Sequence, residues 1–183
     1  MRYVLSVLLI GIFCACGDDD PVEPSFPAGP ANATAISLIF VGPDDQPQTF
    51  EYRTDIDIPD GEIADPPEVD EVVLEPNTTY TLRVSAIEES IGSAGSSTRR
   101  LNDQIEAQAE DYIVLYSVLA ATLDFDVQDL DANGDPIGLQ SLVTTGGPSQ
   151  GVLTLQLKYE AQKSSPSASG TTLIEADFPL RIE

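Results

Sequence analysis

The fold class is most evident at residues 172–183, which read TLIEADFPLRIE. Every second position from 174 to 182 is apolar, and charged residues occupy positions 175, 177, 181 and 183. Because successive side chains of a strand point to opposite faces, this alternation predicts a strand with one face in a core and the other in water.

The same alternation recurs along most of the chain. It is clear in residues 79–86, 123–128 and 152–159, and weaker in residues 36–41, 49–53, 69–75, 112–118 and 138–145. Gly, Pro, Asn and Asp separate these segments, as is typical of turns. Eight or nine short strands joined by turns predict an all-β fold, an antiparallel immunoglobulin-like β-sandwich.

One stretch departs from this pattern and has helical periodicity. In residues 97–110, Leu101, Ile105 and Ala109 recur at every fourth position among acidic residues. This spacing places the three side chains on one face of a helix. We therefore expect a single short helix that bridges two strands of the sandwich.

The composition limits the kinds of partner. The chain has 183 residues with 31 acidic and 8 basic side chains, a formal net charge of -23. Such a surface repels phosphate backbones, which excludes nucleic acid as a partner and leaves cations as the ions it attracts. A simpler explanation is that the charge keeps an exported domain in solution.

The N-terminus has the layout of a lipoprotein signal peptide. Arg2 precedes an apolar run over residues 4–13 that is too short for a membrane-spanning helix, and Ala15 is the small residue that a lipobox needs before its cysteine. We expect a signal peptide over residues 1–15 and lipidation of Cys16; an ordinary secretory signal with incidental cysteines is the alternative. Acidic and Pro-rich residues 16–34 predict an extended tether, and residues 35–183 the sandwich domain.

The start of the tether resembles a surface-export signal. Gly17 and three aspartates at positions 18–20 follow Cys16 directly. This run is similar to the one that sends lipoproteins of Bacteroidota to the outer leaflet. The resemblance implies a protein that is lipid-anchored in the outer membrane and exposed at the cell surface, with a periplasm-facing location as the alternative.

The side-chain inventory argues against catalysis. The chain has no histidine, and both cysteines lie within residues 1–16. A Ser-His-Asp triad or a Cys-His pair therefore cannot form in the processed chain, and we predict a protein that is not an enzyme and has no catalytic residues. The enzymatic alternative is a surface glycan hydrolase that uses an Asp/Glu pair, although the chain has no tryptophan of the kind that usually lines sugar clefts.

An Asp-rich segment resembles the first half of a calcium-binding loop. Oxygen ligands stand at alternate positions, at Asp129, Asp131, Asn133 and Asp135. The position that needs a bidentate glutamate is Gln140, so we expect at most weak calcium binding, in a structural or adhesion module. Asn133-Gly134 is also a strong hairpin signal, and a plain turn is the favoured interpretation.

A second acidic segment spans residues 55–71 and contains eight acidic residues and three prolines. It has three interpretations: a divalent-cation site, an acidic face for a partner, or a solvated loop. The solvated loop is favoured because charge runs usually mark solvated segments.

Four motifs resemble a family of Bacteroidota lipoproteins. They are PNTTYTL at 76–82, an acidic helix ending in AED at 109–111, DLDANGDPIG at 129–138 and GVLTLQLKYE at 151–160. Members of this uncharacterised family are often labelled "type 1 periplasmic binding fold superfamily protein", and the likeness covers most of residues 36–183. The label implies an α/β fold, whereas the alternation predicts β structure. The resemblance also implies histidines, suited to a transition metal, at the positions of Tyr112 and Tyr159, so this chain should not bind such a metal there.

Together these features predict a non-catalytic outer-membrane or cell-surface lipoprotein. It would act as a binding or accessory module that serves a TonB-dependent uptake system, as other small β-sandwich lipoproteins of that lineage do. The expected partners are the membrane, through the N-terminal lipid, and an outer-membrane transporter or another surface protein.

Overall fold

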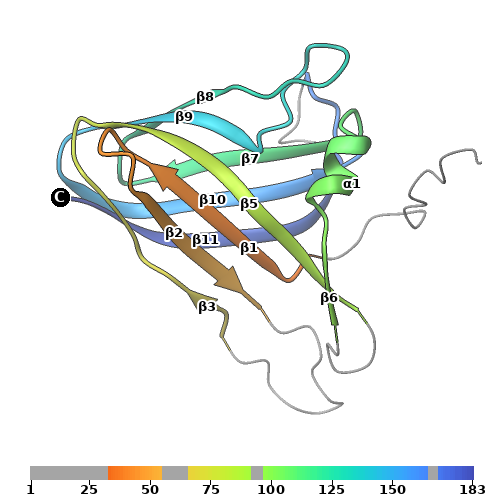
Figure 1. The fold of residues 1–183 in the computed structure, drawn as a ribbon, viewed down its shortest axis with the longest axis horizontal. Helices are drawn as coiled ribbons and strands as arrows, with labels where there is room; N and C mark the ends of the chain where they lie inside the picture. Colours follow the sequence, from red (N-terminus) through yellow and green to blue (C-terminus); the bar gives the residue numbers. More distant parts are fainter. Residues whose placement is uncertain (1–32, 55–65, 92–96, 165–168) are drawn as a thin grey trace, which may run out of the picture.

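The computed structural model describes residues 33–54, 66–91, 97–164 and 169–183, and these residues form two packed β-sheets with one short helix (Figure 1). The predicted signal peptide, Cys16, nearly all of the tether and residues 55–65 of the acidic segment lie outside the described residues. Among the described residues, no helix has the length and apolar character needed to cross a membrane.

The larger sheet has seven strands built around a long central strand, β5 (Thr79–Ile91). On one side of β5 the order continues through β1 (Ala35–Val41) and β2 (Pro47–Arg53) to β3 (Glu68–Val69). On the other side, β9 (Gln140–Thr145) and then β8 (Leu123–Val127) follow one half of β5. β6 (Ser97–Arg100) pairs with the remaining half. All of these pairs are antiparallel.

The smaller sheet has four strands in the order β4-β11-β10-β7. Its centre is the antiparallel pair of β10 (Ser149–Tyr159) and β11 (Thr171–Ile182). β7 (Tyr112–Leu119) pairs antiparallel with β10, and β4 (Val72–Leu74) pairs parallel with β11. The two sheets lie face to face in Figure 1.

The core between the sheets follows the predicted alternation. All five apolar side chains from Ile174 to Ile182 are buried, and Glu175 and Asp177 between them are exposed. The largest fully buried side chains include Phe40, Leu155 and Phe178. These side chains come from both sheets, so their removal from water stabilises the two sheets as one unit.

The predicted fold class, an antiparallel β-sandwich with one short helix, is confirmed. An immunoglobulin constant domain divides its strands four and three, whereas the described part of this chain divides its strands seven and four. The likeness is therefore one of architecture and not of strand order. The α/β fold implied by the family label is wrong for this chain, because its sheets are almost wholly antiparallel and no crossover helix joins strands within the residues that the structure describes.

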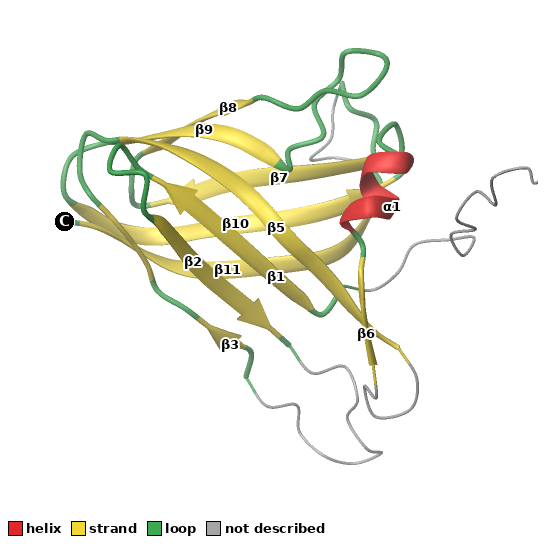
Figure 2. Cartoon of the chain, viewed as in Figure 1, coloured by secondary structure: helices red, strands yellow, loops and turns green. Residues whose placement is uncertain are grey.

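Two local expectations are corrected by long-range pairing. Residues 97–100, expected to begin the helix, form β6, because they pair with the end of β5 and Arg99 forms an ion pair with Glu89. The helix α1 is only Asn102–Ala107 and lies at one end of the sandwich (Figure 2). Residues 69–75, expected as one strand, divide between β3 and β4, which belong to different sheets. Leu101 and Ile105 are buried as predicted.

Candidate functional site

The Asp-rich loop, residues 128–139, connects the antiparallel strands β8 and β9. Its tip is a tight turn in which the Gly134 amide donates to the Asp131 carbonyl at 3.1 Å, and an isolated bridge joins Leu130 to Pro136. Gly134 has a φ of 86°, in the region that favours glycine. The chain therefore turns at this segment as the hairpin interpretation predicts, but Ala132 and Asn133 are the central residues of the turn and Gly134 follows them.

The Asp129 carboxylate organises the return of this loop toward β9. Its Oδ1 accepts the amides of Gly138 and Gln140, each at 3.1 Å, and its Oδ2 accepts the Leu139 amide at 2.8 Å. Three backbone donors thus converge on one side chain, which satisfies amides that the turning chain cannot pair in a ladder. The Asp129 carboxylate therefore stabilises the backbone of its own loop.

The Asp131 carboxylate has a different set of partners. Its Oδ1 accepts the amides of Asn133 and Asp135, both at 2.9 Å, and its Oδ2 accepts the ammonium of Lys163 at 2.7 Å. The two charged side chains are only 1% and 5% exposed. The hydrogen bond from Lys163 lowers the pKa of Asp131 below its usual value of 3.8, and the two backbone amides act in the same direction against the effect of desolvation.

These partners bear on the calcium interpretation of Asp129, Asp131, Asn133 and Asp135. The ligands of a calcium loop must point at one ion. The carboxylates of Asp129 and Asp131, at the first and third positions, instead accept hydrogen bonds from different donors within the protein. In the described part of the chain, no group of three or more His, Cys, Asp or Glu side chains is arranged to hold a metal ion. The geometry favours the turn over the calcium site.

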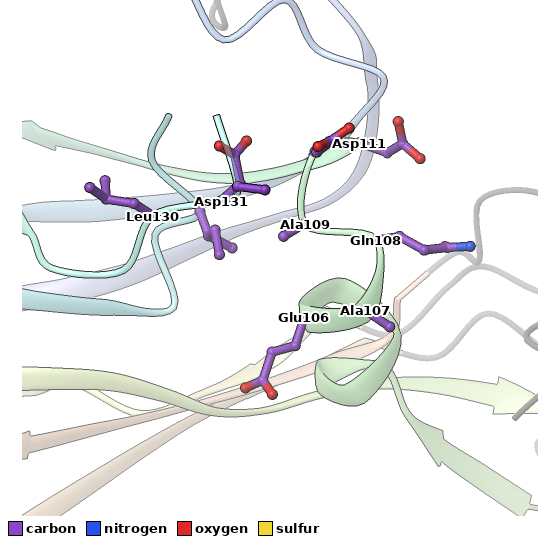
Figure 3. Close-up of a pocket in the computed structure, with 10 residues that line it drawn as sticks. Glu106, Ala107, Gln108, Ala109, Asp111, Leu130 and Asp131 are labelled. Atoms are coloured by element: carbon purple, nitrogen blue, oxygen red, sulfur yellow. The ribbon is translucent and has the colours of Figure 1, made fainter. Parts of the chain in front are cut away.

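A cleft of about 480 Å³ lies between the Asp-rich loop and the segment that follows α1 (Figure 3). We call it the α1 cleft; it is lined by Glu106, Ala107, Gln108, Ala109, Glu110, Asp111, Leu130, Asp131, Ala132 and Ile137. Figure 3 shows Leu130 and Asp131 on one wall and the α1 side on the other. Leu130 is 57% exposed and places an apolar side chain beside the acidic residues of the cleft. The cleft therefore offers an apolar contact beside negative charge.

A second hollow of about 310 Å³ shares Glu106 with the α1 cleft. Arg83 and Arg100 line it together with Asp103, so it carries both signs of charge. The α1 cleft has acids alone among its charged lining residues, which makes it the more selective surface for a positively charged group.

Tyr112 and Tyr159, where the family resemblance implies histidines, are direct cross-strand partners in β7 and β10. Their ring centroids are 5.1 Å apart, and the Tyr112 hydroxyl accepts a hydrogen bond from Gln104 Nε2 at 2.9 Å. Burial raises the pKa of both phenols. The two rings pack against each other across β7 and β10, and the bond from Gln104 ties α1 to the edge strand β7.

Neither the role of Lys163 nor the α1 cleft was predicted from the sequence. Lys163 is 32 residues from Asp131, and nothing in its neighbourhood in the sequence marks it as a partner of the Asp-rich loop. A weak signal existed, because an acidic chain with two lysines, Lys158 and Lys163, has few cations to neutralise buried carboxylates. Which lysine meets which carboxylate depends on the packing of distant loops.

Comparisons of the chain with protein-family models, with curated proteins and with solved structures found no match. Membership of the Bacteroidota lipoprotein family therefore stays a prediction that rests on the four motifs.

Proposed function

We propose that this protein is a non-catalytic, lipid-anchored binding or accessory module of the outer membrane, which faces the cell surface. The observation that carries the binding assignment is the α1 cleft, where Leu130 stands exposed beside a lining that is acidic. Its walls belong to segments held by buried bonds, such as the contact between Asp131 and Lys163. A preformed cleft loses little entropy on binding, which supports recognition of a partner.

Chemical considerations support binding over catalysis. The absence of histidine from the chain leaves the cleft without the usual general base near neutral pH. The Asp131 carboxylate at the wall of the cleft is engaged by an ammonium and two amides. A carboxylate with these partners is stabilised in its charged form and is a weak proton acceptor.

The partner that fits this cleft presents a basic side chain next to an apolar one. Such a partner is expected to be a protein of the same membrane, because the predicted lipid on Cys16 and the tether of residues 16–34 restrict the domain to that surface. We propose a TonB-dependent outer-membrane transporter as this partner, with another surface protein in second place.

The test is a pull-down of the full lipidated chain from native membranes, compared with two matched variants. Leu130→Ser combined with Glu106→Gln alters both walls of the α1 cleft, whereas Leu142→Ser removes another exposed leucine that lies on β9. We expect the wild type and Leu142→Ser to recover an outer-membrane transporter and the cleft variant to lose it.

Recovery of no transporter by the wild type would contradict the proposal. Turnover of a surface glycan by the wild type, abolished by a carboxylate substitution, would replace it with the hydrolase alternative.

A further inference from the structure

Lys163 occupies an unusual position for a lysine. It lies in the connection between β10 and β11, and its ammonium donates to Asp131 Oδ2 and to the carbonyl oxygen of Ala109, each at 2.7 Å. Its side chain is 5% exposed. Lysine is seldom buried to this extent unless its charge is paired.

The partners of this ammonium are the kinds of oxygen that hard metal ions bind, a carboxylate and a backbone carbonyl. Asp131 stands at the third position of the calcium-like pattern, so a metal ion in such a loop would need the same oxygen. An ammonium is a compact point charge with three donors and satisfies these acceptors without a metal.

We propose that Lys163 supplies the cation of the Asp-rich loop from within the chain, so that an internal ammonium, and not a metal ion, closes this loop against the segment after α1. The two bonds of the Lys163 ammonium, to Asp131 and to the Ala109 carbonyl, are called the clamp below. The clamp joins three segments that are distant in sequence: the Asp-rich loop, the segment that follows α1 and the connection from β10 to β11. Two of these segments form the walls of the α1 cleft.

Neighbouring bonds show what the clamp adds. The Glu160 amide donates to the Asp111 carbonyl at 2.7 Å, which joins the β10–β11 connection to the segment after α1. The return side of the Asp-rich loop is attached to β7, because the Val114 amide donates to the Ile137 carbonyl at 2.7 Å. Lys163 holds the opposite side of the loop through Asp131, and thereby sets the spacing of the cleft walls.

Removal of the ammonium leaves the Asp131 carboxylate and the Ala109 carbonyl without their cation. Lys163→Ala leaves space beside Asp131 and the Ala109 carbonyl. Lys163→Met also removes the charge, but its side chain fills the same space. Arg53→Ala is the matched control for net charge, because Arg53 forms an exposed ion pair with Glu51 at 3.2 Å.

The experiment measures thermal unfolding of the full chain and these variants in EDTA and in about 10 mM calcium, well above the Kd of weak extracellular sites. In EDTA we expect Lys163→Ala and Lys163→Met to melt below the wild type and below Arg53→Ala. Calcium should leave the Tm of all four proteins unchanged, because Asp129 faces backbone amides and the single Asp131 carboxylate cannot supply the roughly six to eight oxygens that calcium takes. A calcium-specific rise in the wild type, or Tm values of Lys163→Ala and Lys163→Met in EDTA equal to that of Arg53→Ala, would overturn the proposal.

A second measurement covers the case in which Lys163→Ala does not fold. With only two lysines in the chain, lysine-selective ¹⁵N labelling yields two side-chain signals to assign. The proposal requires an ammonium signal from Lys163 in the wild type that is protected from exchange with water, and its loss in Asp131→Asn. Rapid exchange of the Lys163 ammonium in the wild type would refute a buried clamp.

Discussion

At the scale of single residues, Asp131 makes stability depend on pH. The hydrogen bond from Lys163 lowers the pKa of Asp131 in the folded state below 3.8. A lowered folded pKa contributes stability above the unfolded pKa, and this contribution is lost as the pH falls through the folded pKa. We therefore expect a loss of stability from about pH 4 downward.

The measurement is urea denaturation of the wild type and Asp131→Asn across this range. The difference in unfolding free energy between the two proteins should shrink as the pH falls, which separates Asp131 from the titration of the other acids. A difference that stays constant between neutral pH and strong acid would contradict the assignment.

Gly138 and Gly134 form a natural pair for testing backbone strain against steric contact. Both have positive φ, 92° and 86°, but a Cβ on Gly138 would overlap the carbonyl oxygen of Val114, whereas a Cβ on Gly134 would meet nothing within 4 Å. Gly134→Ala should cost about 1–2 kcal/mol for its φ alone. Gly138→Ala should cost roughly 3 kcal/mol or more in urea denaturation, because overpacking is added to the strain. Equal losses of unfolding free energy in the two variants would show that Val114 in β7 moves away from the added Cβ at little cost.

At the scale of elements, Asn102 attaches α1 to the long strand β5. Its Oδ1 accepts the Ile87 amide at 2.8 Å, and its Nδ2 donates to the Val84 carbonyl at 3.0 Å. The register between β1 and β5 shifts by one residue in this region, so Asn102 supplies bonds where the regular ladder is interrupted.

Removal of this side chain should loosen the helix from the sheet. We expect Asn102→Ala to lower the free energy of unfolding by about 2 kcal/mol, because two partly buried backbone groups lose their partners. Asp103→Ala is the control: Asp103 is exposed in the first turn of the same helix, and its loss should cost only about 0.3–1 kcal/mol. Similar losses of unfolding free energy in both variants would show that Asn102 stabilises the helix itself and not its attachment to β5.

At the scale of the whole molecule, the predicted anchor is Cys16. Cys16→Ser should abolish incorporation of radiolabelled palmitate and release the protein from the membrane fraction, because lipid chains contribute about 0.8 kcal/mol per buried CH₂ group to membrane binding. Cys14→Ser should have little effect, since Cys14 follows the bulky Phe13 and does not meet the lipobox requirement. Palmitate in the Cys16→Ser protein would show that the cleavage site lies elsewhere.

Periodicity was sufficient to predict the sandwich. The alternation through Ile174 and Phe178 is a local property, because a strand with one wet face must place every second side chain in the core. The same local reasoning failed at residues 97–100 and 69–75, where pairing with β5 and division between two sheets outweighed the local pattern. Such pairing is decided by distant partners and overrides propensity.

The Asp-rich segment shows the same division at the level of the site. Asn133-Gly134 predicted a turn, and the chain turns over Asp131 to Gly134, because the positive φ that glycine permits is encoded at the turn itself. The identity of the cation beside Asp131 could not be predicted locally, since Lys163 reaches Asp131 from the connection between β10 and β11. A buried charge acquires its partner only when the loops pack, because the low-dielectric surroundings that make the pairing necessary do not exist in the extended chain.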